Sequence, residues 1–319
     1  MDQTQRIEYN GRREGWPSRV TESATTGQTP PTGSGGSDLP DLRIVPLAAV
    51  VPHEQADPRR VTRLSRRIAG DGLLKNPVVV TPIPGSDRYM VMDGANRTAA
   101  LVEVGARDVL AQIVHYNEPG VALTTWHHLI TGLDAGALLT AIAALPDLVL
   151  YPCPPDAARA ALAARQAVAY LVHPPHDGQA AQVYLLTAPR LDPARETALL
   201  LQIVDLYKGK PETAIHRVGS DRITDYLDQY AGVSALIVFP PYQPAEILEL
   251  ARAGLRVPTG ITRHIIPARA LRVNVPLALL RDPAQSLAAK NAWWREHVKA
   301  KLADNEIRYY QESTYLFDE

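Results

Sequence analysis

The chain has 319 residues, of which 46% are hydrophobic, and this is enough apolar side chain for the cores of more than one domain. Its 33 basic and 34 acidic residues give a net charge of −1, which excludes the strong positive field of non-specific nucleic-acid binders. A single cysteine, Cys153, excludes an internal disulfide, and no apolar signal, lipid motif or membrane-spanning run is recognisable, so we expect a cytoplasmic protein without membrane contacts.

The first predicted elements are a leader, a strand and a basic helix. Residues 1–40 are rich in Thr, Gly, Pro and Ser with little to bury, which predicts a disordered leader. The run Leu42–Leu47 predicts a strand, and a turn then places Glu54 ahead of a helix from Asp57 to Gly70. The outer face of this helix is basic, because it carries Arg59, Arg60, Arg63, Arg66 and Arg67. These side chains could bind nucleotide phosphates or a DNA backbone, but simple exposure to solvent is the more common role of such a face.

Three more strands and a second helix complete the first predicted domain. The strands are expected over Leu73–Val80, from Tyr89, and near Val109–His115, with the helix between the last two. The order strand, helix, strand, strand, helix, strand then covers residues 41–116. We expect this segment to fold as one α/β (α+β) domain.

The junction between the third strand and the second helix has the features of a phosphate site. Asp93 and Gly94 form a tight turn at the end of an apolar strand, and good helix formers follow. Free backbone N–H groups at a helix start attract anions. Arg97 adds a planar set of donors that suits phosphate, and Asp93 could hold a divalent cation or one of its waters.

An Ala- and Leu-rich second region begins at about residue 117 and reads as a second α/β domain over residues 117–319. Helices are expected over residues 119–145, 155–166, 197–207, 221–230 and 244–253, and strands over residues 147–152, 167–173, 181–188 and 235–240. The aromatic tail from Trp293 to Phe317 predicts a packed cap or a contact between copies.

Four motifs in this order resemble the free L-serine kinases of the ParB/sulfiredoxin superfamily. They are the run Gly72–Val80, the Asp-Gly-x-x-Arg-x-x-Ala-Leu signature Asp93–Leu101, the Trp-containing segment Thr124–His128, and the Gly-Ile-Thr-Arg-His motif Gly260–His264. The resemblance implies a ParB/sulfiredoxin-like nucleotide-binding catalytic domain first, and a substrate-binding α/β domain with a C-terminal cap after it.

The same resemblance implies an enzyme, a phosphotransferase that moves a phosphoryl group from ADP or ATP to the hydroxyl of free L-serine, giving O-phospho-L-serine. In that reading Glu54 is the general base and Asp93 holds Mg²⁺ against the phosphates. It assigns phosphate binding to Gly94, Ala95, Asn96 and Arg97, and serine binding to Trp126, Thr262 and His264. The product would then feed the biosynthesis of cysteine or of a siderophore-type building block.

One departure keeps other functions open. Many relatives place a histidine in the turn where this chain has Ala95 and Asn96, and asparagine cannot take up a proton. A non-catalytic nucleotide-binding regulator is therefore one alternative, and a ParB-like DNA-binding switch is another, although no helix-turn-helix is recognisable. A sulfiredoxin-like role lacks the cysteine that its chemistry needs. The sequence leaves open ADP or ATP, serine or another hydroxy-amino acid, the pathway and the oligomeric state.

Each candidate residue also has a purely structural reading. Glu54 could favour the positive end of the next helix, and Asp93 could be a turn residue. Trp126 could be an ordinary core aromatic. His127 and His128 are adjacent without a cysteine or an acidic cluster nearby, so we do not expect a zinc site.

Overall fold

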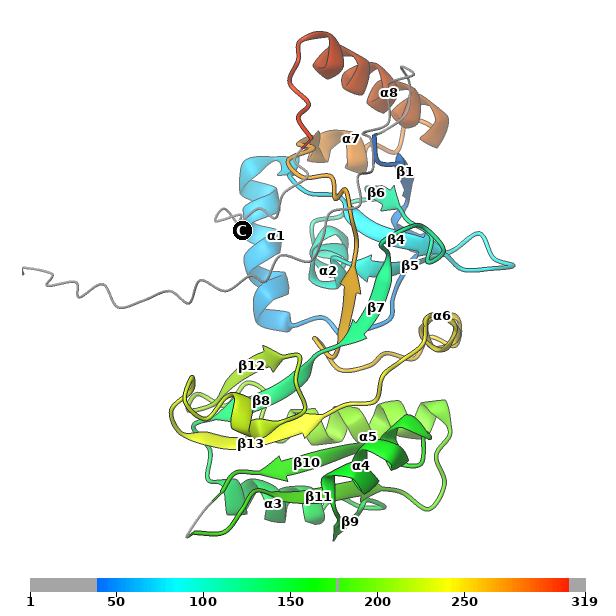
Figure 1. Cartoon of the computed structure of the whole chain (residues 1–319). Helices are drawn as coiled ribbons and strands as arrows, with labels where there is room; N and C mark the ends of the chain where they lie inside the picture. Colours follow the sequence, from blue (N-terminus) through cyan, green and yellow to red (C-terminus); the bar gives the residue numbers. More distant parts are fainter. Residues whose placement is uncertain (1–38, 176–177, 310–319) are drawn as a thin grey trace, which may run out of the picture. The chain divides into compact units, whose positions relative to one another are not determined.

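The computed structural model describes residues 39–175 and 178–309, and within them it contains two main sheets with helices packed on them (Figure 1). The predicted α/β class is confirmed. Most of the predicted leader, and Tyr310, Tyr315 and Phe317 of the tail, lie outside the described residues. No helix within the described ranges is both long and apolar enough to cross a membrane.

The first sheet is formed by the predicted strands of the first domain, with one more short strand. Its five strands run in the order β1-β6-β4-β5-β2, where β2–β5 and β4–β6 are the parallel pairs. The strands are β1 (Leu42–Pro46), β2 (Val50–Pro52), β4 (Val78–Pro82), β5 (Tyr89–Asp93) and β6 (Asp108–Ile113), with a 3-10 turn at Leu47–Ala49. The helices are α1 (Pro58–Asp71) and α2 (Ala95–Glu103).

Helix α1 begins and ends where its local sequence requires. The Asp57 carboxylate accepts the N–H groups of Arg59 and Arg60, Pro58 occupies the first turn, and Gly72 ends the helix in a left-handed conformation with φ 66°. The apolar stripe faces the core, and the five arginines of the predicted basic face are exposed. The predicted helix is therefore confirmed.

The second sheet has six strands in the order β12-β8-β13-β10-β11-β9, and every neighbouring pair is antiparallel. The strands are β8 (His127–Thr131), β9 (Val149–Pro152), β10 (Ala169–His173), β11 (Gln182–Thr187), β12 (Ala214–Val218) and β13 (Val233–Val238). The helices are α3 (Ala135–Ala143), α4 (Pro155–Ala163), α5 (Pro193–Asp205) and α6 (Pro244–Arg252).

Two predicted helices of the second region were wrong. Residues 119–145 form β7 (Ala122–Thr125), β8 and only then α3, because β8 is buried on both faces and has no polar alternation to mark it as a strand. Residues 221–230 contain only a 3-10 turn at Ile223–Asp225, where Ser220 hydrogen-bonds the side chains of Asp225 and Tyr226 and holds a compact loop. The strand β12 was not predicted at all.

The last part of the chain returns to the first sheet. Strand β15 (Val275–Pro276) pairs with β3 (Leu73–Leu74), and the helices α7 (Leu277–Arg281) and α8 (Leu287–Ala303) follow. The side chain of Asn291 on α8 bonds both the N–H (2.9 Å) and the C=O (2.8 Å) of Ile44 on the edge strand β1. Trp294, 5% exposed, packs into the core of the first sheet. Residues 275–303 thus pack beside the first sheet, although the predicted boundary at residue 117 would assign them to the second domain. The boundary itself stays a prediction.

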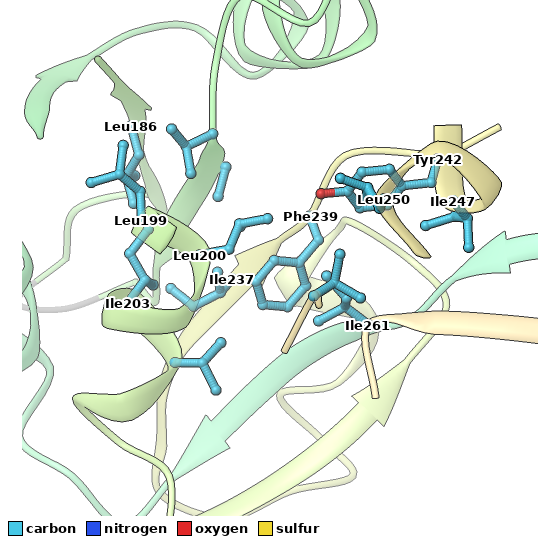
Figure 2. Close-up of a cluster of buried hydrophobic side chains, with 14 of the residues drawn as sticks. Leu186, Leu199, Leu200, Ile203, Ile237, Phe239, Tyr242, Ile247, Leu250 and Ile261 are labelled. Carbon is cyan, nitrogen blue, oxygen red and sulfur yellow. The ribbon is translucent and has the colours of Figure 1, made fainter. Parts of the chain in front are cut away.

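The largest apolar cluster surrounds Phe239 at the end of β13 (Figure 2). Leu200 and Ile203 of α5 lie on one side of it, and Leu250 of α6 and Ile261 belong to the same cluster. Met90 and Met92 of β5 also belong to this cluster. The core therefore joins side chains of both sheets, and the strand pair β7 and β14 (Thr262–Ile265) belongs to this region.

Candidate functional site

The predicted phosphate turn is formed between β5 and α2. Gly94 is the N-cap of α2 with φ 103°, and no side chain caps the helix start. A Cβ on Gly94 would lie 3.2 Å from Cγ1 of Val78 and 2.9 Å from Nη1 of Arg97, so both the backbone conformation and the space require glycine. The first amides of α2 are thus left for a partner from outside the helix.

The side chains of Asn96 and Arg97 hold this turn from two sides. Asn96 Oδ1 accepts the N–H of Asp57 at 2.6 Å, which ties α2 to the start of α1. Arg97 is largely buried, and its Nη1 donates to the carbonyl of Pro77 at 2.6 Å. Asn96, one of the two residues noted as a departure from the family pattern, therefore has a structural partner.

Asp93 lies at the end of β5 and forms an ion pair with Arg269 from the late part of the chain. The two side chains are 40% and 41% exposed, so solvent and a ligand can reach both. Arg97 Nη1 lies 3.9 Å from the same carboxylate oxygen. The sequence predicted Asp93 as a cation ligand, and the structure places a guanidinium cation against it.

Glu54 lies in the loop between β2 and α1, where backbone bonds join this loop to a segment two hundred residues later. The N–H of Val257 donates to His53 and the N–H of Gln55 donates to Val257, both at 2.9 Å. The N–H of Gly260 then donates to Glu54 Oε2 at 3.0 Å. Two motifs that were predicted to share a site are thus in direct contact.

Arg217 and Lys208 surround this contact, and the sequence analysis missed both. Gly260 has φ 79°, and a Cβ there would overlap the guanidinium of Arg217, so the two groups are packed face to face. Desolvation lowers the pKa of Arg217, and the nearby carboxylate of Glu54 opposes this shift. Lys208 Nζ lies 3.5 Å from Oγ1 of Thr259. Arg217 is on β12, whose sequence Ala-Ile-His-Arg-Val does not alternate between apolar and polar residues, so no local pattern marked this strand.

Thr262 is held by a buried histidine, His53, that was also missed. Burial lowers the pKa of His53, which keeps its ring neutral near pH 7. Its Nδ1 lies 2.6 Å from the carbonyl of Val91 and its Nε2 lies 2.8 Å from Thr262 Oγ1. Because a carbonyl only accepts, Nδ1 carries the proton and Nε2 accepts the Thr262 hydroxyl. The lone pairs of Thr262 Oγ1 are therefore left to accept from another donor.

The other two predicted substrate residues lie on either side of Thr262. His264 Nε2 is 2.7 Å from the hydroxyl of Tyr116, and the backbone of Met92 also bonds the ring. Burial lowers the pKa of His264 to about 3, so this ring is neutral, and both of its nitrogens have hydrogen-bond partners. The backbone N–H of Trp126 donates to the carbonyl of Ile261 at 2.9 Å, and the guanidinium carbon of Arg263 lies 4.2 Å from the centre of the Trp126 ring.

We expect the fold to lose stability in mild acid because burial lowers the pKa of several histidines, His53 among them. Burial lowers the pKa of His264 and of His128 to about 3, and that of His127 to about 4. An unfolded histidine binds a proton near pH 6.5, so stability is present above that pH and is lost as the pH falls, by up to about 1.4 kcal/mol per pH unit for each histidine. Urea midpoints measured between pH 7 and pH 5 check this. A midpoint that does not move would contradict it.

The chain is similar in sequence to known proteins. Residues 37–125 match the family model of the ParB N-terminal domain. Over 89 residues the chain is 39% identical to an ATP-dependent L-serine kinase of Staphylothermus marinus, a match that spans 28% of this chain and about a third (35%) of that relative. It is 26% identical over 281 residues to the ATP-dependent L-serine kinase SbnI of Staphylococcus aureus, over 87% of this chain and 97% of SbnI.

The fold is also shared with solved structures. A free serine kinase in complex with AMP superposes with a TM-score of 0.64 at 19% identity, over 76% of this chain and 97% of that one. A C-terminally truncated SbnI superposes with a TM-score of 0.59 at 22% identity, over 83% of this chain and 97% of that one. The predicted resemblance is thus confirmed: residues 37–125 match the ParB N-terminal domain, and the chain resembles the free serine kinases in sequence and in fold.

Proposed function

We propose that the protein is a free L-serine kinase, which transfers a phosphoryl group from a nucleotide to the serine hydroxyl and forms O-phospho-L-serine. The observation that carries this proposal is the hydrogen bond from the Gly260 N–H to Glu54, because it joins the acidic loop to the Gly-Ile-Thr-Arg-His motif. The names of the relatives from Staphylothermus and Staphylococcus support the same activity. Since nucleotides are cytoplasmic, we infer a cytoplasmic location.

Glu54 acts as the general base. Gly260 occupies its Oε2, and no described residue bonds its Oε1, which is left for the serine hydroxyl. As the serine oxygen forms its bond to phosphorus, the hydroxyl proton moves to Glu54, and the bond to the leaving nucleotide breaks.

Positive groups near Glu54 would stabilise the transferring phosphoryl group. Arg217 packs against Gly260, the partner of Glu54, and Lys208 reaches the neighbouring residue Thr259. The uncapped amides from Ala95 onward supply a second set of donors for the nucleotide phosphates. Phosphoryl transfer depends mainly on such positioning and charge neutralisation.

The residues fit a magnesium ion at Asp93. Mg²⁺ is commonly held by one or two carboxylates together with phosphate oxygens and water, and Asp93 offers one accessible carboxylate. The ion would neutralise charge on the phosphates. Arg269 pairs with the same carboxylate, and its side chain is 41% exposed, so it could turn towards a phosphate when the ion binds.

The assay that tests the proposal is ³¹P NMR of the full chain with Mg²⁺ and L-serine, with ADP and ATP in separate samples. An O-phosphoserine signal with either nucleotide is the expected result, and it also identifies the donor. L-threonine in place of L-serine tests the acceptor. Nucleotide binding without any phosphorylated amino acid would contradict the kinase and favour the non-catalytic regulator.

Thr262→Val is expected to raise the KM for L-serine at least tenfold with little change in nucleotide affinity. The neutral His53 fixes the Thr262 hydroxyl as a donor, so its oxygen can accept from the serine ammonium group. Removing a hydrogen bond to a charged group costs roughly 1.5–3 kcal/mol. Steady-state kinetics and nucleotide titration check this split. Thr124→Val, an exposed threonine on the paired strand, is the matched control.

A further inference from the structure

The second sheet borders a separate cavity of about 500 Å³, a size in the range of small-molecule sites. It lies between the start of β8, the end of β13, helix α4 and strand β7. Its walls are mostly apolar and include Leu123 and Leu162. Polar groups gather at one side, where His127, Arg159, Tyr170 and Asp221 line the cavity. None of the residues assigned above to the kinase reaction lines this cavity.

The cavity and the Glu54 site lie on opposite faces of β8. Side chains alternate along a strand, so His127 and His128 point to different sides. His128 Nδ1 lies 2.8 Å from the hydroxyl of Tyr207 after α5, and the backbone of Gly260 also bonds its ring. Gly260 is the residue that contacts Glu54, so His128 faces the proposed reaction site and His127 faces the cavity.

His127 presents an unused donor to the cavity. Its side chain is only 9% exposed, and its Nδ1 accepts the N–H of Phe239 at 3.3 Å. Burial lowers the pKa of His127 to about 4, so the ring is neutral and the proton is on Nε2. Within the described part of the chain no group accepts from Nε2. Among the described residues, His127 Nε2 is not one of the fully buried side-chain atoms that lack a partner, so this N–H faces the cavity and is free to donate to a ligand there.

Asp221 has an unused hydrogen-bond acceptor, which is the complement of the unused donor on His127. Its Oδ2 accepts from Tyr170 at 2.7 Å and from Nε of Arg159. These bonds keep the pKa of Asp221 below its usual range, although its partial burial acts against this. No described residue donates to its Oδ1. The polar side of the cavity therefore combines a donor, a carboxylate acceptor and the guanidinium of Arg159.

We propose that this cavity binds a free amino acid with an apolar side chain. The carboxylate of the ligand accepts from His127 Nε2 and lies near Arg159, and its ammonium group donates to Asp221 Oδ1. The side chain of the ligand packs against the apolar wall. A zwitterion suits the site because it brings both charges: Arg159 pairs with Asp221 and, through Nη1, with the exposed Asp156, so the guanidinium and two carboxylates lie at this side of the cavity. Thr125, which lines the cavity, is paired with Thr262, so the ligand would lie next to the strand that carries the serine site.

The test is isothermal titration of the full chain with L-leucine, L-valine and L-phenylalanine, each without nucleotide. At least one of these probes is expected to bind. Ala163→Phe fills the cavity from its exposed edge and is expected to weaken binding at least tenfold, whereas Ala164→Phe, the next residue and not part of the lining, is expected to leave it unchanged. No binding of any probe, or equal binding by Ala163→Phe, would overturn the proposal.

Two further measurements identify the site. Asp221→Asn keeps the size of the side chain and one oxygen but removes the negative charge that the ligand's ammonium group needs. L-leucine should therefore bind this variant at least tenfold more weakly than wild type. The control ligand 4-methylpentanoate has no ammonium group and should bind both proteins equally. Excess L-serine should not displace L-leucine, and displacement would show a shared site and overturn the inference. None of these readouts uses phosphoryl transfer, so failure of the kinase assay would leave this proposal standing.

Discussion

Replacing Glu54 by glutamine is expected to lower the rate of O-phosphoserine formation by roughly 10²–10⁴-fold, the usual contribution of a general base. Glutamine retains an oxygen that can accept the Gly260 N–H, so the loop keeps its hydrogen bond. It cannot take the hydroxyl proton of serine. The loss should therefore appear in kcat, with little change in the affinity for nucleotide.

The measurement is steady-state production of O-phosphoserine together with nucleotide titration of the same preparation. Glu249→Gln is the matched control, because Glu249 is an exposed glutamate on α6 that pairs only with Arg252. This variant should keep full activity. A Glu54→Gln enzyme with undiminished kcat would remove the general base from the mechanism, and a large loss of nucleotide affinity instead would assign Glu54 to binding.

Lys290→Met is expected to destabilise the fold by roughly 3–5 kcal/mol, the typical cost of removing one partner of a buried ion pair. The Lys290 side chain is fully buried, and its Nζ donates to Asp108 Oδ2 at 2.6 Å and to the carbonyl of Asp282 at 2.7 Å. Methionine fills similar space but leaves the carboxylate of Asp108 without its partner. Urea unfolding of the two proteins measures the difference.

Two more variants separate charge from packing in this prediction. Lys299→Met changes an exposed lysine on the same helix, 69% exposed and paired with Glu296, and should alter stability by less than about 1 kcal/mol. The double variant Lys290→Met with Asp108→Asn should recover part of the loss, because no buried charge is then unpaired. Equal stability of Lys290→Met and wild type would show that the ion pair contributes nothing to the fold.

The first domain could be predicted because its signals are local. The cap at Asp57, the glycine that ends α1 and the turn at Gly94 each act over a few residues, and the structure places all three as expected. Strand β8 could not be recognised, because a strand buried on both faces resembles a buried helix in composition. The alanine-rich stretch that follows it favoured the helix.

The candidate site was harder to predict because it depends on pairing between distant segments. Glu54 and Gly260 are 206 residues apart, and no spacing rule joins them. Their association was expected only from the resemblance to a family. Arg217 was missed because its position becomes meaningful only when β12 is placed beside β8, and Lys208 was missed for a similar reason. His53 was hidden beside the more obvious Glu54.

The two hydrogen bonds between the Asn291 side chain and the backbone of Ile44 also matter while the protein is being synthesised. The edge strand β1 leaves the ribosome early, whereas the amide that satisfies its backbone groups arrives near the end of translation. Until then β1 exposes an N–H and a C=O that can template pairing with a strand of another chain. A chain whose translation ends before α8 should therefore aggregate in cells, even though every residue of the phosphate turn is present.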